Sequence, residues 1–556
     1  MNKKVCSFPI LFALLALLIG TCAVVFPASA QAAPTSTGSI TVSGTVASSY
    51  DAYQIFSANV VDGDSDAKIA TDLAWASDAV RDAALPVLHS AGMPNSQITA
   101  QEAVEWLNTD SHLTSALSAQ LARSLQSSGA VSVALNAGAA TELPCGYWLI
   151  VADDDAISQN EAGTAPIMAL VGGSAVTVKP KAATPKVAKH VLEDSTAAWG
   201  KAADATVADD LYWRLSATVP AGLTAYDTYT VRFVDTMSAG LDPSKVAASM
   251  RVYVAAGADG GFDAVQTDKD GRVGTDPAKG WTDITAQCAT KVAVDGKTFT
   301  VRTGDLIAAL GGADAFTAGA RVVAVYNAPL NSACNHGIAK GNPNEAYLRY
   351  PRSPFADQSG DAGFTRTPSD DACAYTWDLA LTKRGSDGDK PLAGAVLSIA
   401  DDRGCTLAAD GTWDAEGKAT VTTGEDGRVT VSGVDSGKLE VRELKAPKGY
   451  TAFEGTRSVT VKAEGLDVDQ VAAAKPKLTI TAESPLRADS ADGSTGSLEA
   501  SIINTPTGTP PSITTGGFMP STGDMAMYAA AAAAVAGAAL IVVALLVKRG
   551  GGSHKE

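Results

Sequence analysis

Four lysines crowd into one short stretch of this chain and could carry amine chemistry. They are Lys179, Lys181, Lys186 and Lys189, within AVTVKPKAATPKVAKHV at 175–191. The chain as a whole is acidic, with a formal net charge of −17. A protonated lysine is not a nucleophile, but burial in an apolar core disfavours its charge and lowers its pKa. The stretch therefore raises the question of which lysines are solvated charges and which form bonds.

Other groups of potentially reactive residues predict less. The stretch QTDKDGRVGTD at 266–276 resembles a calcium-binding loop. It lacks the Asp at the first ligand position and the Glu at the last, so a β-turn is expected there. The five histidines show no metal-ligand spacing, and there is no phosphate-binding loop. We expect no metal and no cofactor.

The two ends of the chain indicate export and anchoring. Lys3 and Lys4 precede the apolar run ILFALLALLIG and the small residues PASAQA, which is the pattern of a signal peptide over 1–32. The segment 525–547 carries no charge and is long enough to cross a bilayer as a helix. The basic tail 548–556 follows it and would stay on the cytoplasmic side. The sequence therefore predicts a membrane-inserted precursor.

A short motif precedes the apolar segment. After a Pro/Thr/Gly spacer at 508–518, the residues MPSTG at 519–523 resemble the LPxTG sorting signal of Gram-positive surface proteins, with Met519 in place of leucine. That resemblance implies that a sortase cleaves between Thr522 and Gly523. It would then transfer Thr522 to an amine, which leads to anchoring on peptidoglycan.

Composition and patterning predict about three domains in the mature chain. Aromatic residues make up only 6%, and Thr, Val, Gly and Asp abound, as in β domains with many turns. The negative charge argues against nucleic acid as a partner. In the first domain, 33–180, alternating strands are interrupted by ITAQEAVEWL and LTSALSAQLARSLQ, which read as amphipathic helices.

Two further domains follow, and both have the pattern of β-sandwiches. The second, 181–354, contains strands such as DTYTVRFVD, RVYVAA and ARVVAVYNA between Gly- and Asp-rich turns. A polar connector is expected at 351–372. The third domain, 373–507, has short strands such as TWDLALTK and SLEASIIN. We therefore expect a mostly β protein with tandem immunoglobulin-like sandwiches after a mixed β/α domain.

The third domain resembles a family of self-stapled sandwiches. LTKRGSDGDKPLAGAVLSI, TGEDGRVTVSGV, VRELKAPKGY and IINTP occur in that order, as in the Cna-B family. In that family a lysine and an asparagine are joined by an isopeptide bond. By motif, the resemblance implies Lys383 as the amine, Asn504 as the acceptor amide and Glu443 as the catalytic acid. The alternative is an ordinary salt bridge between Lys383 and Glu443.

Such a reaction is chemically reasonable in a dry core. Burial lowers the pKa of the lysine and raises that of the carboxyl group. A neutral carboxyl can hydrogen-bond the asparagine carbonyl, polarise it and shuttle the proton. If the amine is held in near-attack geometry, it displaces ammonia without another enzyme.

The second domain resembles the fimbrial isopeptide-forming D2 family. The matching stretches are VAKHV, VRFVDTMSAGL and GNPNEAYLRYPRSP. The resemblance implies a bond between Lys189 and Asn344, with Asp235 as the catalytic acid. Lys186 and Asn342 are rival positions that spacing does not exclude.

The remaining lysines belong to a third resemblance. VTVKPK at 176–181 resembles the end of the pilin motif, whose final lysine accepts the sortase-cleaved threonine of the next subunit. Lys181 takes that place. Lys179 stands where the family has tyrosine, and the upstream tryptophan of the motif is missing. The alternative is a solvated basic linker. YDAYQIF in the first domain also resembles the N-terminal domain of Gram-positive backbone pilins.

Five cysteines remain after signal removal, in a compartment that permits disulfides. We expect Cys288 to pair with Cys334 and Cys373 with Cys405, one pair in each later domain, which leaves Cys145 alone.

Together these features predict a structural subunit of a covalent, wall-anchored surface fimbria, and no enzyme beyond self-directed amide formation. The expected partners are a sortase, further copies of the chain, minor pilins and peptidoglycan, with a host ligand as a further possibility. The alternative is a monomeric wall-anchored adhesin that binds a host ligand.

Overall fold

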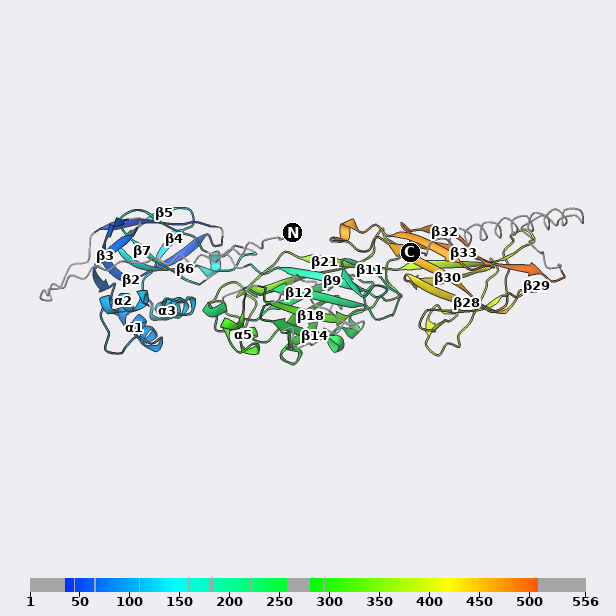
Figure 1. Cartoon of the computed structure of the whole chain (residues 1–556), viewed down its shortest axis with the longest axis horizontal. Coiled ribbons are helices and arrows are strands. Elements are labelled where there is room, and N and C mark those ends of the chain that lie inside the picture. Colours follow the sequence, from blue (N-terminus) through cyan, green and yellow to red (C-terminus); the bar gives the residue numbers. More distant parts are fainter. Residues whose placement is uncertain are drawn as a thin grey trace, which may run out of the picture.

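The computed structural model describes residues 36–508 except 45, 65–66, 110, 159, 164, 181–183, 221–222, 258–280, 294–295 and 318. Three domains follow one another in chain order along the long axis of the molecule (Figure 1). Over the described residues they consist mainly of β-strands, and only the first domain has helices longer than four residues there. The expected mostly β class is therefore confirmed.

Several expectations fall on residues outside the described ranges. These are the signal peptide 1–32, the spacer from 509 onward, the sorting motif 519–523, the apolar segment 525–547, the tail 548–556 and the stretch 266–276. Within the described part of the chain, no helix has the length and apolar character needed to cross a membrane.

The first domain has three layers. A five-stranded sheet, β3-β2-β6-β7 with β4 on β2, lies between a three-stranded sheet, β5-β1-β8, and a group of helices. Successive strand residues face opposite sides, so in β6 Leu149 packs on the helices and Trp148 on the small sheet. The strands are β1 (Thr37–Val42), β2 (Ser49–Asp62), β3 (Lys68–Trp75), β4 (Val133–Asn136), β5 (Ala140–Pro144), β6 (Gly146–Ala152), β7 (Ile167–Val171) and β8 (Val176–Val178).

Three capped helices cover one face of the larger sheet. The predicted pair is present as α2 (Ala100–Asn108) and α3 (Ser115–Ser128). In α2 the Thr99 and Glu102 side chains form a capping box, which satisfies backbone groups at the helix start. The helix α1 (Asp78–Ser90) was not predicted, and it contains Pro86.

The second domain is a sandwich of two sheets around the largest apolar core. One sheet has the order β10-β9-β12-β18-β14-β15, and the other has β11-β21-β19-β13-β17-β16 with β20 on β19. Two short helices, α4 (Val246–Ser249) and α5 (Leu306–Ala309), lie in its connections. The strands are β9 (Val187–Glu193), β10 (Ala198–Gly200), β11 (Ala202–Asp204), β12 (Tyr212–Thr218), β13 (Arg232–Met237), β14 (Arg251–Ala255), β15 (Trp281–Asp283), β16 (Ala289–Val292), β17 (Thr298–Arg302), β18 (Arg321–Asn327), β19 (Asn342–Pro351), β20 (Phe364–Arg366) and β21 (Asp370–Tyr375).

The end of the second domain differs from the expectation. Both β20 and β21 pair with β19, so most of the polar connector expected at 351–372 belongs to the second domain. The two short strands were not predicted because the segment is rich in Ser, Gly and Asp, which are typical of loops. Only Thr376 separates β21 from the first strand of the third domain.

The third domain is also a two-sheet sandwich. One sheet has the order β27-β22-β33-β29 with β32 on β33, and the other has β25-β24-β23-β28-β30-β31 with β26 on β23. Its first and last strands, β22 and β33, run parallel side by side. The strands are β22 (Trp377–Gly385), β23 (Val396–Ala400), β24 (Thr406–Leu407), β25 (Trp413–Asp414), β26 (Val421–Thr422), β27 (Arg428–Val434), β28 (Gly437–Lys445), β29 (Tyr450–Thr451), β30 (Thr456–Glu464), β31 (Lys477–Ala482), β32 (Leu486–Asp492) and β33 (Ser497–Pro506).

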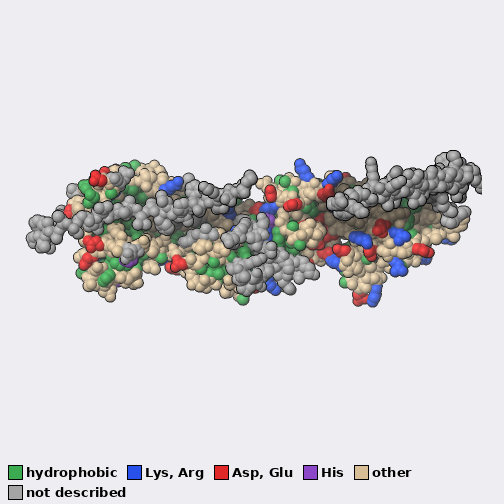
Figure 2. Space-filling view, viewed as in Figure 1, with side chains coloured by type: hydrophobic (Ala, Val, Ile, Leu, Met, Phe, Trp, Pro, Cys, Tyr) green, Lys and Arg blue, Asp and Glu red, His purple; other side chains and the backbone are tan. Residues whose placement is uncertain are grey.

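The surface of the third domain is charged with both signs interspersed. Figure 2 shows Lys and Arg beside Asp and Glu over its visible face. Mixed charge of this kind protects exposed strands from pairing with other chains.

Candidate functional site in two buried lysine clusters

The three residues predicted for the third domain meet in its core. Lys383 is near the end of β22 and Asn504 near the end of β33, while Glu443 reaches them from β28 in the opposite sheet. In the parallel register Lys383 lies opposite Ile502. Residues two apart share a face of a strand, so Asn504 lies on the same face as Lys383. The Lys383 and Glu443 side chains are fully buried, and Asn504 is 1% exposed.

The polar atoms of this cluster are in hydrogen-bond contact. The Lys383 Nζ donates to Asn504 Oδ1 and lies 3.3 Å from Glu443 Oε1. The Asn504 Nδ2 donates to the same Glu443 oxygen at 2.9 Å. We expected the acid to bond the amide carbonyl, but it faces the amide nitrogen, which is the group that would leave as ammonia.

The surroundings of the amine favour its neutral form. Burial lowers the pKa of Lys383 to about 8, against the opposing effect of Glu443. The Phe453 ring lies 5.7 Å from the Lys383 Nζ, and the Phe453 N–H donates to Glu443 Oε2 at 3.1 Å. Phe453 was not predicted. It covers the amine with an apolar group and fixes the carboxylate through its backbone.

The three residues predicted for the second domain also converge. Lys189 is on β9 of one sheet, whereas Asp235 on β13 and Asn344 on β19 belong to the other. All three residues have no exposed surface. The cluster therefore lies between the two layers of the sandwich.

A tyrosine joins the members of the second cluster. The Lys189 Nζ donates to Asp235 Oδ2 and, at 2.8 Å, to the Tyr326 hydroxyl. That hydroxyl donates to Asp235 Oδ2 at 2.8 Å and accepts from Asn344 Nδ2 at 2.9 Å. Tyr326 is on β18 and is fully buried. Sequence patterning missed it because β18 is buried on both faces, so no alternation marks the side that faces the cluster.

Burial shifts every titratable group of this cluster towards its neutral form. It lowers the pKa of Lys189, raises the pKa of Asp235 and holds the pKa of Tyr326 well above 10. The Trp213 ring adds an apolar wall 5.3 Å from the Lys189 Nζ. An amine and a carboxyl group that are both driven towards neutrality are suited to proton exchange and amide formation.

The rival positions are engaged elsewhere. Lys186 is exposed and precedes β9. Asn342 is buried, but its side chain accepts from the Asn335 N–H at 2.8 Å and donates to the Asn335 carbonyl at 2.9 Å. The geometry therefore favours Lys189 and Asn344.

The expected disulfides are not formed. The five cysteines within the described ranges are free thiols, so the pairings Cys288–Cys334 and Cys373–Cys405 are corrected. Cys288 donates its thiol hydrogen to the Ile284 carbonyl at 3.2 Å. Cys373 belongs to β21 of the second domain, whereas Cys405 follows β23 of the third. The misplaced domain boundary had put Cys373 in the same domain as Cys405.

The residues predicted to polymerise the chain are outside the described ranges. They are Lys181, Thr522 and Gly523. The described residues next to Lys181 are Pro180 and the exposed Lys179, which follows β8.

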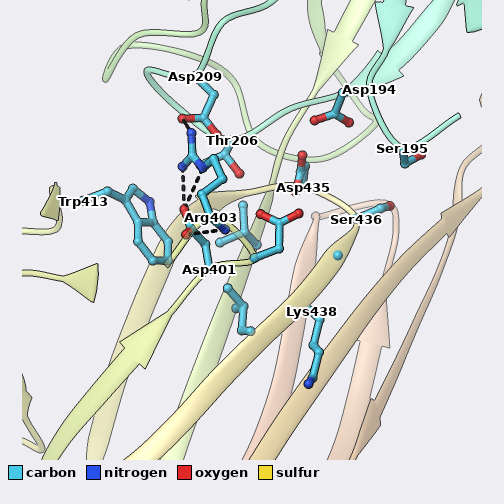
Figure 3. Close-up of a pocket in the computed structure, with 14 residues that line it drawn as sticks. Asp194, Ser195, Thr206, Asp209, Asp401, Arg403, Trp413, Asp435, Ser436 and Lys438 are labelled. Carbon is cyan, nitrogen blue, oxygen red and sulfur yellow. Dashed lines mark hydrogen bonds and ion pairs between the residues drawn. The ribbon is translucent and has the colours of Figure 1, made fainter. Parts of the chain in front are cut away.

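A hollow between the second and third domains has five aspartates among its fourteen lining residues. Figure 3 shows Arg403 of the third domain bonded to Asp209 of the second and to Asp401 of its own. Asp194 and Asp435 line the same hollow. Across the described ranges, no group of three or more His, Cys, Asp or Glu has the arrangement of a metal site. We interpret the hollow as an electrostatic contact between domains.

Parts of the chain are similar to known proteins. Residues 378–475 match the family described as SpaA, a prealbumin-like fold domain. The chain is 31% identical over 143 residues to the trypsin-resistant surface T6 protein of Streptococcus pyogenes serotype M6. That match covers 24% of this chain and 24% of the relative, so the chain matches about a quarter of the length of this relative.

Two solved structures show a distant similarity to this chain. The T6 backbone pilin of serotype M6 S. pyogenes has a TM-score of 0.45 and 17% identity, covering 85% of this chain and 98% of that one. The full-length major pilin SpaD of Corynebacterium diphtheriae has a TM-score of 0.41 and 16% identity, with the same coverage.

Proposed function

We propose that this chain is a structural pilin subunit, polymerised by a sortase into a wall-anchored fimbrial shaft and stapled internally by two Lys–Asn isopeptide bonds. The observation that carries the proposal is the pair of buried lysine, acid and asparagine clusters in consecutive sandwiches. The matched SpaA domain contains Lys383 and Glu443. The similarity to a surface T6 protein supports the location.

In the third domain the bond forms by displacement of ammonia. The Lys383 Nζ, neutral in part because of its lowered pKa, attacks the Asn504 Cγ. A new C–N bond forms, and the bond from Cγ to Nδ2 breaks. Glu443, in contact with both nitrogen atoms, takes the proton released by the lysine and returns it to the leaving ammonia. Fixed positions in the core replace a separate enzyme.

In the second domain Asp235 and Tyr326 share this work. Asp235 contacts the Lys189 amine and so takes its proton. The Tyr326 hydroxyl contacts both the carboxylate and the Asn344 Nδ2. It can therefore relay a proton from Asp235 to the departing nitrogen, which the acid does not reach directly. Tyr326 replaces the direct contact that Glu443 makes in the third domain.

The positions of the bonds explain their mechanical use. Tension along a fibre enters the third domain at the start of β22 and leaves at the end of β33. A Lys383–Asn504 bond joins these two strands near their C-terminal ends. The part of the chain between Lys383 and Asn504 would then carry no load. In the second domain a Lys189–Asn344 bond likewise joins β9 to β19 and shields the intervening segment.

Polymerisation needs a donor and an acceptor on each subunit. We assign the donor to Thr522, after cleavage from Gly523, and the acceptor to Lys181 at the junction of the first two domains. A head-to-tail contact of this kind does not close on itself and grows a filament. Further copies, minor pilins and finally peptidoglycan would be the successive amine partners of the sortase.

Cell-surface extracts boiled in detergent test this function. Wild-type cells should give a ladder of covalent multimers. Lys181→Arg keeps the charge but removes the usable amine, so it should leave wall-anchored monomers without a ladder. Lys179→Arg is the matched control and should keep the ladder. If Lys181→Arg keeps the ladder and Lys179→Arg loses it, the acceptor is Lys179. Ladders in both variants would contradict the acceptor assignment, and a wild-type monomer without a ladder would favour the adhesin.

A further inference from the structure

The junction of the second and third domains holds a second kind of reactive cluster. Cys334 and His336 are in the segment between β18 and β19 of the second domain, and Asp378 is on β22 of the third. The cysteine is a free thiol. None of these residues takes part in the amide chemistry described above.

The three side chains form a continuous chain of polar contacts. The Cys334 Sγ lies 3.5 Å from His336 Nε2, and His336 Nδ1 lies 2.7 Å from Asp378 Oδ1. The order is nucleophile, base and orienting carboxylate, which is the arrangement that activates a thiol. The Asp378 oxygen also accepts from the Gly433 N–H at 3.2 Å, which fixes its position.

The histidine carries a positive charge at neutral pH. Hydrogen bonds to Asp378 and to Cys334 raise the pKa of His336 to about 10. An imidazolium beside a thiol favours the thiolate, which is the reactive form of cysteine. Burial raises the pKa of Cys288 and of Cys373 to about 11, which disfavours the thiolate at those two positions.

The segment that carries the thiol is held on both sides. The Cys334 N–H donates to the Asn331 carbonyl at 3.0 Å, and the Gly337 N–H donates to Thr376 at 3.0 Å. A Cβ on Gly337 would lie 2.6 Å from the Gly496 nitrogen in the third domain. Gly337 is therefore required for close contact between the domains, and the histidine keeps its place against Asp378.

We propose that Cys334 is a nucleophilic thiol, activated by His336 and oriented through Asp378, and that it is a modification site for small peroxides. Cys334 is only 9% exposed, and the His336 side chain is 27% exposed. Access is therefore limited to small electrophiles that approach along the histidine.

The reaction balances with the groups present and one peroxide. The thiolate sulfur attacks one oxygen of the peroxide, so an S–O bond forms and the O–O bond breaks. The departing hydroxide takes the proton of the His336 imidazolium and leaves as water. Cys334 is oxidised to a sulfenic acid and the peroxide is reduced.

Brief labelling of the folded full-length protein with iodoacetamide tests the thiol. In a second sample, hydrogen peroxide followed by dimedone tests the oxidation. Peptide mass spectrometry then gives a rate for each of the five cysteines from Cys145 to Cys405, so the other four are internal controls. Cys334 should react at least about tenfold faster than Cys288 and Cys373. Equal or slower labelling of Cys334 would overturn the proposal.

Two variants separate activation from simple exposure. His336→Gln and Asp378→Asn should each slow the labelling of Cys334 by about tenfold, with the rate at Cys405 unchanged. The difference between the wild-type and His336→Gln labelling rates at Cys334 should narrow from about pH 7 to pH 9, because rising pH produces thiolate without help from the histidine. Unchanged rates and pH profiles in both variants would overturn the role of the histidine. Faster labelling of Cys373 in a variant would show that the junction between the domains has opened. In that case, an unchanged pH dependence of Cys334 labelling would overturn the role of the histidine.

Discussion

The hydroxyl of Tyr326 donates to the carboxylate of Asp235 at 2.8 Å in the closed core of the second domain. The same hydroxyl is the contact between the acid and the asparagine that we expect to react. Tyr326→Phe should therefore slow bond formation and leave unreacted second-domain peptides after refolding. Its loss also leaves buried polar groups unpaired, at a cost of about 1–3 kcal/mol.

A second buried tyrosine supplies the control for this variant. Tyr350 is fully buried on β19, and its hydroxyl has no hydrogen-bond partner among the described residues. Tyr350→Phe should keep normal bond formation. Equal rates of ammonia loss in the two variants, followed by mass spectrometry, would show that Tyr326 has no part in the reaction.

Glu443→Gln should prevent bond formation in the third domain. The variant keeps the shape of the side chain but cannot take up the proton of Lys383. The unbonded domain should lose stability comparable to that from removing a disulfide, about 2–5 kcal/mol. Thermal unfolding and protease digestion measure this loss. The control is Glu440→Gln, because Glu440 is exposed on the same strand and pairs with the exposed Lys438. A stapled third domain in Glu443→Gln would rule out the acid role.

The choice between two asparagines can be tested directly. Asn344→Ala should abolish the second-domain bond, and Asn342→Ala should keep it. The latter should still destabilise the domain, since its three side-chain hydrogen bonds are lost. Peptide mapping for a Lys189–Asn344 crosslink separates the two results. A crosslink that survives in Asn344→Ala and disappears in Asn342→Ala would reverse the assignment.

The contact between the second and third domains should weaken as pH rises. Burial, aided by Asp204, raises the pKa of Glu193 to about 7 from its ordinary 4.5. The folded state thus binds a proton more tightly than the unfolded state. The stability from that proton is present at low pH and is lost between about pH 4.5 and pH 7. Asp204 in turn accepts from Trp377 and Ser436 of the third domain.

Denaturant unfolding at several pH values checks this dependence. The wild type should lose stability across that window, whereas Glu193→Gln should show a flatter profile. Glu142→Gln, at an exposed glutamate of the first domain, should keep the wild-type slope. An unchanged slope in Glu193→Gln would place the pH dependence on other groups.

Patterning predicted the strands that carry the clusters, but not every partner. The alternation in TWDLALTK and SLEASIIN indicated β22 and β33, whose side-by-side pairing brings Lys383 close to Asn504. Helix α1 was not predicted because Pro86 interrupts its helical sequence pattern. The strand β21 was not predicted because its first residues, Asp370 and Asp371, are typical of a loop. Tyr326 could not be singled out, since a strand buried on both faces has no polar side to orient it.

The mass of the purified mature protein, measured after reduction, shows whether both isopeptide bonds form. We expect a deficit of two ammonia molecules from the sequence mass. Asn504→Ala and Asn344→Ala should each show a deficit of one ammonia molecule instead of two, relative to their own sequence masses. The full sequence mass in the wild type, or an unchanged deficit of two in either variant, would contradict the assignment of the two buried clusters as isopeptide sites.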